Sequence, residues 1–123
     1  MQMNQESSSK ELRMYIVVNT DAKMGKGKIA AQTGHAVMLT TEYMLTHRPE
    51  AYDQYKRDGM IKITLKADLA TINELAKDAS CIIIRDAGRT QVAANTLTAI
   101  AFPPMTDETK AKFHPGLSHL KLL

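Results

Sequence analysis

The chain is poor in cysteine and in aromatic residues: it has one cysteine, no tryptophan, and only 5% aromatic residues among 123. A single cysteine excludes an internal disulfide. Because Cys81 opens an apolar run, we expect a small buried side chain there and not a reactive thiol. No apolar stretch approaches the ~20 residues that cross a bilayer, and residues 1–11 lack the apolar core of a secretion signal. We therefore expect a cytoplasmic protein without a membrane anchor.

The length of the chain indicates one domain, and its net charge only weakly restricts the kind of partner. A chain of 123 residues is one domain by the usual prior, so we expect a disordered tail over 1–11 and a single domain over 12–123. Lysine and arginine exceed aspartate and glutamate by 16 to 13. This excess is compatible with a polyanionic partner without requiring one. The bases cluster in two places, at 23–28 and at 85–89.

The hydrophobic pattern predicts an α/β fold. Strands are expected over 12–19, 60–66, 80–84 and 96–102, with helices from 26 or 28 to 47, over 49–58 and over 69–78. Pro103 and Pro104 are expected to stop the last strand, and the segment after them reads as poor in helix until a short apolar end. This order predicts a three-layer α/β/α arrangement around a mixed, mostly parallel sheet of about four strands.

The first stretch that is able to carry chemistry is 23–32, KMGKGKIAAQ, between the first strand and the long helix. A helix N-terminus offers free backbone N–H groups, and the lysines add positive charge. Gly25 and Gly27 are expected to allow unusual backbone angles. No serine or threonine follows Lys28, so the loop is not a magnesium-binding P-loop. The alternative is a solvated lysine turn that only caps the helix.

Three polar residues follow at helical spacing. Lys28, Gln32 and His35 stand at i, i+4 and i+7, so they form one stripe that faces either water or a cavity. His35 is either part of a site or a structural histidine bonded within the fold. No second histidine or cysteine stands at metal-ligand spacing, so we expect no metal site.

The second stretch is 86–91, DAGRTQ, which follows an apolar strand. Asp86 and Thr90, with the ammonium of Lys28, have the chemistry to hold and polarise a water molecule. The alternative is that Asp86 pairs with Arg85 or Arg89 and caps its own turn. No covalent-nucleophile motif is present, which favours direct attack by water.

Both stretches, in this order and spacing, resemble the type 2 peptidyl-tRNA hydrolases of archaea and eukaryotes. The resemblance covers 14–123. It also includes Val17, Val18, His35, Thr96, Thr98 and the closing segment 119–122. It implies hydrolysis of the ester between a peptidyl group and the terminal ribose of tRNA, without metal or cofactor, by a protein that is often a homodimer.

By the same resemblance, the catalytic positions are Lys28, Asp86, Thr90 and Thr98. The substrate-binding candidates are Gln32 and His35, which match family motif positions, and the basic residues Lys23, Lys26, Arg85 and Arg89. These bases are candidates for the phosphates of the tRNA acceptor end, and such contacts are sensitive to salt. With few aromatics, stacking on bases should contribute little. The alternatives are a non-catalytic RNA-binding or protein-interaction module on the same fold, and a small nucleotide-binding protein.

The sequence departs from the family pattern near its C-terminal edge. Ala94 and Asn95 replace a Pro-Gly pair, and asparagine tolerates the left-handed backbone that such a turn needs. Residues 117–119 replace the usual Thr-Gly, and the helix expected between Met105 and Pro115 looks weak. We expect these changes to affect the C-terminal edge and any dimer contact more than the central site.

Overall fold

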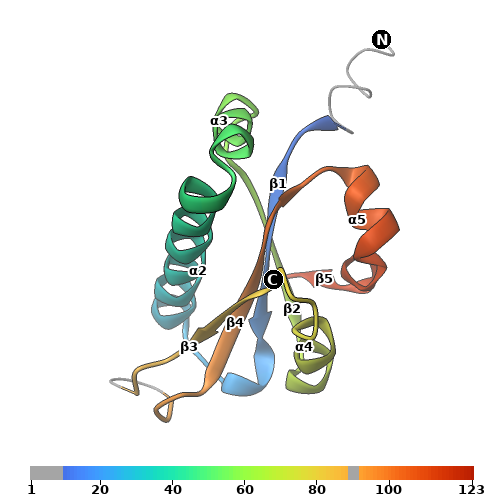
Figure 1. Ribbon diagram of the computed structural model, residues 1–123. Helices are drawn as coiled ribbons and strands as arrows, with labels where there is room; N and C mark the ends of the chain where they lie inside the picture. The colour runs from blue at the N-terminus through green and yellow to red at the C-terminus, as the bar shows by residue number, and fades with distance from the viewer. Residues whose placement is uncertain (1–9, 89–91) are drawn as a thin grey trace.

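The computed structural model describes residues 10–88 and 92–123. Residues 1–9, the greater part of the predicted tail, lie outside this description, as do Arg89, Thr90 and Gln91. The described chain forms three layers, with helices on both faces of a five-stranded sheet, as Figure 1 shows. The α/β class and the three layers are therefore confirmed.

All seven predicted elements are present with the predicted type. In chain order, the described residues form the predicted elements and four further ones: β1 (Arg13–Asn19), η1 (Thr20–Ala22), α2 (Lys26–His47), α3 (Pro49–Arg57), β2 (Ile61–Ala67), α4 (Leu69–Leu75), β3 (Ile82–Arg85), β4 (Leu97–Met105), α5 (Asp107–Phe113), η2 (Pro115–His119) and β5 (Lys121–Leu122). Helices α2 and α3 cover one face of the sheet, and α4 and α5 cover the other (Figure 1).

The sheet has the order β3-β4-β1-β2-β5. It is mixed, as predicted, but it has one strand more than the four expected. Among the described strands, β1 and β2 pair in parallel and the other three pairings are antiparallel, so the pairings are not mostly parallel. Two of the three antiparallel pairings arise because β4 enters between β1 and β3 and runs opposite to both, and the third joins the additional strand β5 to β2.

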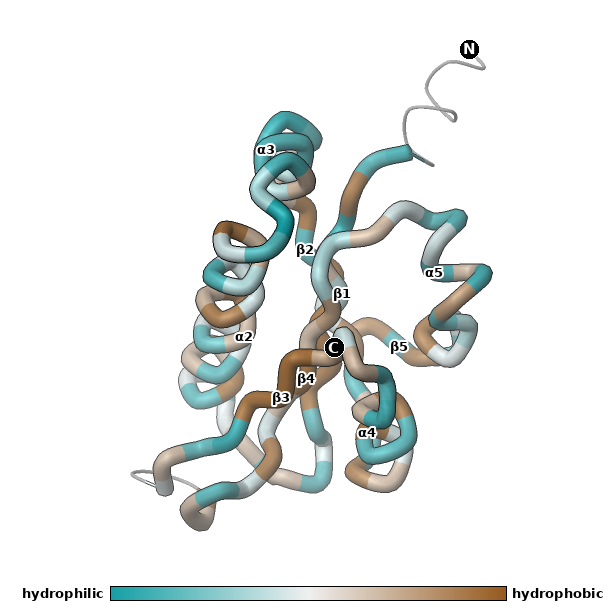
Figure 2. Tube along the Cα trace, in the orientation of Figure 1, coloured by the Kyte–Doolittle hydropathy of each residue, from teal (hydrophilic) through white to brown (hydrophobic). Residues whose placement is uncertain are grey.

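Strand β1 is buried on both faces because its side chains alternate. Met14 and Ile16 pack in one apolar cluster with residues of α2 and α3. Tyr15 and Val17 pack in a second cluster with residues of α4 and η2. A strand covered on both faces reads as a continuous apolar run, which is why the sequence identified it. Figure 2 shows hydrophobic residues along β3 and β4 in the middle and a mostly hydrophilic α3 at the outside.

The prolines do not end the last long strand, because β4 continues through Pro103 and Pro104 to Met105. The register with β1 shifts at this point, between the pairs Tyr15–Phe102 and Arg13–Met105. A proline lacks an N–H donor and is tolerated at such an irregularity. The predicted end at residue 102 was therefore wrong.

The segment after β4 contains the helix α5, although its sequence pattern was interpreted as poor in helix and the family helix expected there looked weak. Thr106 is the N-cap of α5, and its hydroxyl oxygen accepts a hydrogen bond from the backbone N–H of Thr109 at 3.2 Å. Acidic residues occupy the first turn and lysines the last, as the helix dipole favours. Arg13 of β1 also donates to Asp107 at 2.7 Å. These capping signals were present in the sequence and were missed.

In the part of the chain that the structure describes, no helix combines the length and the apolar character needed to cross a membrane.

Candidate active site at one end of the sheet

The loop that leads into α2 has one left-handed residue, and it is a lysine. Lys23 has φ 55°, whereas Gly25 is extended with φ −77° and serves as the N-cap of α2. Gly27 lies inside the helix, and a Cβ added there would meet nothing within 4 Å. The expectation of unusual angles at both glycines was wrong. The small size of Gly27 instead leaves open space beside the first turn of α2.

Lys28 and Asp86 form an ion pair between α2 and the loop after β3. Asp86 Oδ1 accepts from Lys28 Nζ and, at 3.2 Å, from Gln32 Nε2. Asp86 Oδ2 accepts from the backbone N–H of Gly88 at 2.6 Å. The side chains of Lys28 and Asp86 are only 10% and 4% exposed.

The pKa of Asp86 lies below its ordinary value. The largest cause is the hydrogen bond from Lys28. The positive charge of Lys28 and the backbone N–H groups of Gly88 and Ala87 act in the same direction, and desolvation acts against them. A carboxylate with several donors stays ionised at neutral pH.

Behind the ion pair, a buried polar chain runs into the sheet. Thr98 of β4 donates its hydroxyl hydrogen to Gln32 Oε1, and Gln32 in turn donates to Asp86. Gln32 is 3% exposed and Thr98 is fully buried. Thr98 therefore reaches the site only through Gln32.

The backbone of the Asp86 loop is fixed from both sides. Asp86 N–H donates to Thr96 O at 2.9 Å, and Asn95 N–H donates to Asp86 O at 2.7 Å. Asn95 adopts the left-handed conformation with φ 66°, as its replacement of a glycine predicted. Gly88 has φ 80°, and a Cβ there would lie 2.6 Å from Ala94 Cα. No larger residue fits at position 88 without movement of the loop.

One buried polar residue near the site was missed by sequence reasoning. Asn19 ends β1 and is 3% exposed. Its side chain donates to Leu97 O at 2.8 Å and accepts from Asp21 N–H at 2.9 Å. It thus ties the start of the lysine loop to the start of β4. An asparagine at the end of a buried strand and before a turn was the available signal.

The basic residues lie around this centre with different partners. Lys23 and Lys26 are exposed on the loop and the first turn of α2. Arg85 is exposed and donates to Asn95 O at 3.1 Å, so the partner of Asp86 is Lys28 and not Arg85. Asp86 does accept from Gly88, so the turn-capping alternative holds beside the ion pair. Arg89 and Thr90 fall outside the described residues.

A cavity of about 430 Å³ opens at the ion pair. Its lining includes Lys28, Gln32, His35 and Asp86. The predicted polar stripe of α2 therefore faces a cavity. Met38 and Leu39 line the same cavity farther along α2.

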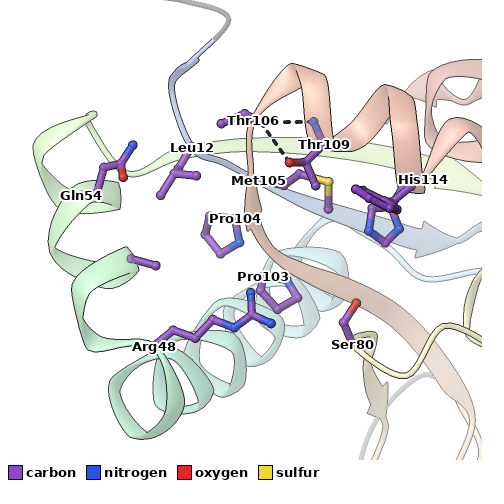
Figure 3. A pocket seen from close by; sticks show the side chains of 12 residues that line it. Leu12, Arg48, Gln54, Ser80, Pro103, Pro104, Met105, Thr106, Thr109 and His114 are labelled. Carbon is purple, nitrogen blue, oxygen red and sulfur yellow. Dashed lines mark hydrogen bonds between the residues drawn. The ribbon is translucent and has the colours of Figure 1, made fainter.

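A second cavity, of about 410 Å³, lies at the other end of β4, between α3 and α5 (Figure 3). Pro103 and Pro104 line it together with Arg48 and His114. No carboxylate occurs among its lining residues. Within 10–88 and 92–123, no group of three or more His, Cys, Asp or Glu side chains is placed to hold a metal ion.

Comparison with known proteins identifies the family of this chain. A family model described as peptidyl-tRNA hydrolase PTH2 matches residues 12–123. The chain is 39% identical over 118 residues to the peptidyl-tRNA hydrolase of Methanocaldococcus jannaschii, covering 91% of this chain and 100% of that protein. It belongs to the type 2 peptidyl-tRNA hydrolase family.

Animal relatives match over a shorter share of their length. The chain is 37% identical over 117 residues to the probable peptidyl-tRNA hydrolase 2 of Drosophila melanogaster, covering 90% of this chain and 61% of that protein. It is 37% identical over 102 residues to the human protein named mitochondrial peptidyl-tRNA hydrolase 2, covering 78% of this chain and 57% of that protein.

Proposed function

We propose that this chain hydrolyses the ester between a peptidyl group and the terminal ribose of tRNA, which releases the peptide and recycles the tRNA. One observation supports this above the others. A shielded ion pair of Lys28 and Asp86 stands in a cavity next to the open N-terminus of a long helix. The arrangement brings a cation, an ionised carboxylate and the positive end of a helix to one point.

Lys28 is assigned to the charge that develops on the substrate. When water attacks the ester carbonyl carbon, negative charge builds on the carbonyl oxygen. The Lys28 ammonium and the positive end of α2 stabilise that oxygen. The bond to the ribose oxygen then breaks, the acyl group keeps the hydroxyl of the water, and the ribose oxygen takes the proton.

Asp86 is assigned to the attacking water and to the position of Lys28. Its lowered pKa keeps it ionised, so it accepts a hydrogen bond from the water and orients it toward the ester carbonyl carbon. The same low pKa makes it a weak base at neutral pH, so its assigned role is orientation and not proton abstraction. Thr90 stays a predicted donor to the water or to the leaving oxygen.

Gln32 and Thr98 are assigned as positioning residues. Both are buried, and each acts through the next member of the chain that ends at Asp86. His35 is exposed and lines the cavity, so it remains a candidate for contact with substrate.

The basic rim is assigned to tRNA. Lys23, Lys26 and Arg85 are exposed close to the ion pair in sequence, and Arg89 follows in the same loop. Contacts from such residues to phosphates carry no sequence information and weaken steeply with salt. We expect KM to rise with ionic strength while kcat changes little.

The test uses two forms of one tRNA, one carrying an N-acetyl-aminoacyl group and one carrying the free amino acid, with EDTA present. We expect rapid deacylation of the blocked form only, and its loss in Asp86→Asn. Salt-sensitive tRNA binding without turnover would replace this proposal with the non-catalytic RNA-binding module. Stabilisation by nucleotides without turnover would favour a nucleotide-binding protein.

We also propose that residues 12–123 act as one domain in the cytoplasm and assemble as a homodimer. Light scattering of the purified chain measures the assembly, and fractionation of cells measures the compartment.

A further inference from the structure

The lining of the proposed active-site cavity changes from polar to apolar along α2. Lys28 and Gln32 line it beside Asp86, and His35 follows one turn later. Met38 and Leu39 line its far part, with 61% and 43% of their surface exposed. Two adjacent large apolar side chains left open in one cavity with a charged pair indicate a surface that contacts a ligand.

The charges of α2 separate the two ends of this cavity. Lysines 23, 26 and 28 gather at the N-terminal end of the helix. Beside the apolar pair stands exposed Glu42, three and four residues beyond Leu39 and Met38, hence on the same helix face. A polyanionic tRNA is attracted to the lysine end and repelled by Glu42, so the apolar end suits the uncharged part of the substrate.

We propose that Met38 and Leu39 form a subsite for the peptide chain of the substrate. This inference rests on the proposed hydrolase function. It assigns a direction to the substrate, with the tRNA acceptor end at the lysines and the peptide running along α2 past His35. Met38 and Leu39 carry neither an aromatic ring nor a guanidinium on which a nucleobase stacks, so the apolar end of the cavity favours an aliphatic occupant.

Helix geometry sets which peptide residue reaches the subsite. Gln32, beside the ion pair, and Leu39 are seven positions apart, which is about 10 Å along a helix axis. An extended peptide advances about 3.3–3.6 Å per residue, so the subsite lies about three residues from the ester. An N-acetyl-aminoacyl group is too short to reach it.

The test compares three substrates on one glycine tRNA: N-acetyl-Gly, N-acetyl-Leu-Gly-Gly and N-acetyl-Glu-Gly-Gly. We expect kcat/KM for the leucine substrate to exceed the other two by roughly tenfold, the low end for burying an apolar group in an enzyme pocket. The double variant Met38→Ser, Leu39→Ser should remove this preference. The control is Leu45→Ser, because Leu45 is 53% exposed on the same helix but does not line the cavity.

A preference for leucine that survives in the double variant, or equal rates for all three substrates in the parent, would overturn the subsite while leaving the hydrolase in place. Failure to cleave any of the three, including N-acetyl-Gly-tRNA, would overturn both the subsite and the proposed function. Loss of the preference in Leu45→Ser as well would also count against the subsite.

Discussion

The two ends of β4 carry cavities of similar volume and very different chemistry. At the Thr98 end, a buried hydroxyl, amide and carboxylate form one chain that ends at Lys28. At the Pro104 end, the lining is apolar and neutral polar apart from Arg48 and His114 (Figure 3). Cavity size therefore does not identify the site. A buried charge is costly unless it is paired, so the place where the fold shields one is more informative.

Removing one cation from each end gives the largest expected contrast. Lys28→Gln takes away the charge nearest to the developing oxyanion, and we expect kcat to fall by about 10²–10³-fold. Arg48→Gln removes a cation from the other cavity and should leave kcat as in the parent. Deacylation of N-acetyl-aminoacyl-tRNA measures both. Similar kcat values for the two variants would mean that the two cavities do not differ in their role in catalysis.

Two glycines allow a sharper test of the site loop. Gly88→Ala forces a Cβ onto Ala94 at a left-handed position, so we expect a loss of at least about 1 kcal/mol in the free energy of unfolding and a clear drop in kcat. In Gly27→Ala the added Cβ meets open space in a helix, so the free energy of unfolding should rise by about 0.5–1 kcal/mol. Urea unfolding measures both changes. Equal effects would mean that the Asp86 loop adapts freely.

A comparison of two buried threonines tests whether Thr98 positions the site or is merely buried. Thr98→Val leaves the oxygen of Gln32 without its donor, so we expect a loss of about 1–3 kcal/mol and a lower kcat. Thr40 is also fully buried, but its hydroxyl has no hydrogen-bond partner among the described residues. Thr40→Val should be neutral or stabilising. If Thr98→Val kept full kcat, the chain from Thr98 to Asp86 would have no part in the reaction.

The smallest expected effect is a shift in the titration of one carboxyl group. The pKa of Asp86 is lowered, so its ionised form stabilises the fold above the unfolded pKa of about 3.9. That stabilisation is lost as pH falls through the lowered folded value. In Lys28→Gln, NMR titration should show the Asp86 midpoint moving up.

Asp78 is the internal control for that titration. Its pKa is lowered mainly by hydrogen bonding from Ser80, so its midpoint should not follow Lys28. A parent Asp86 midpoint at or above the ordinary value would contradict the ion pair as the main influence on this carboxyl.

Local signals were sufficient for most of the fold. Strand β1 was found because burial on both faces leaves an unbroken apolar run, and α2 because its apolar residues recur at helical spacing. The helix α5 was missed although its capping signals are local, whereas the errors in the sheet depended on partners far away in the chain. The position of β4 inside the sheet, and its continuation through Pro103 and Pro104, follow from its pairing with β1 and cannot be read from residues 96–105 alone.

The site shows the same division. Spacing predicted that Lys28, Gln32 and His35 share one face, and the structure confirms that all three line one cavity. The sequence did not predict which cation pairs with Asp86, because Lys28 lies 58 residues away while two arginines are neighbours in sequence. Nor did it show that Thr98 is buried behind Gln32, since that order depends on how α2 packs on β4.

Because β4 lies in the middle of the sheet, the order of synthesis decides when the site can form. A ribosome makes the chain from the N-terminus, so Lys28 and Asp86 both emerge before the strand that joins β1 to β3. Until residues 97–105 are added, these two strands have no common neighbour and Gln32 has no Thr98. A copy cut short before this strand would hold both members of the ion pair and still lack the sheet that brings them together. Activity should therefore begin only after residues 97–105 have been made.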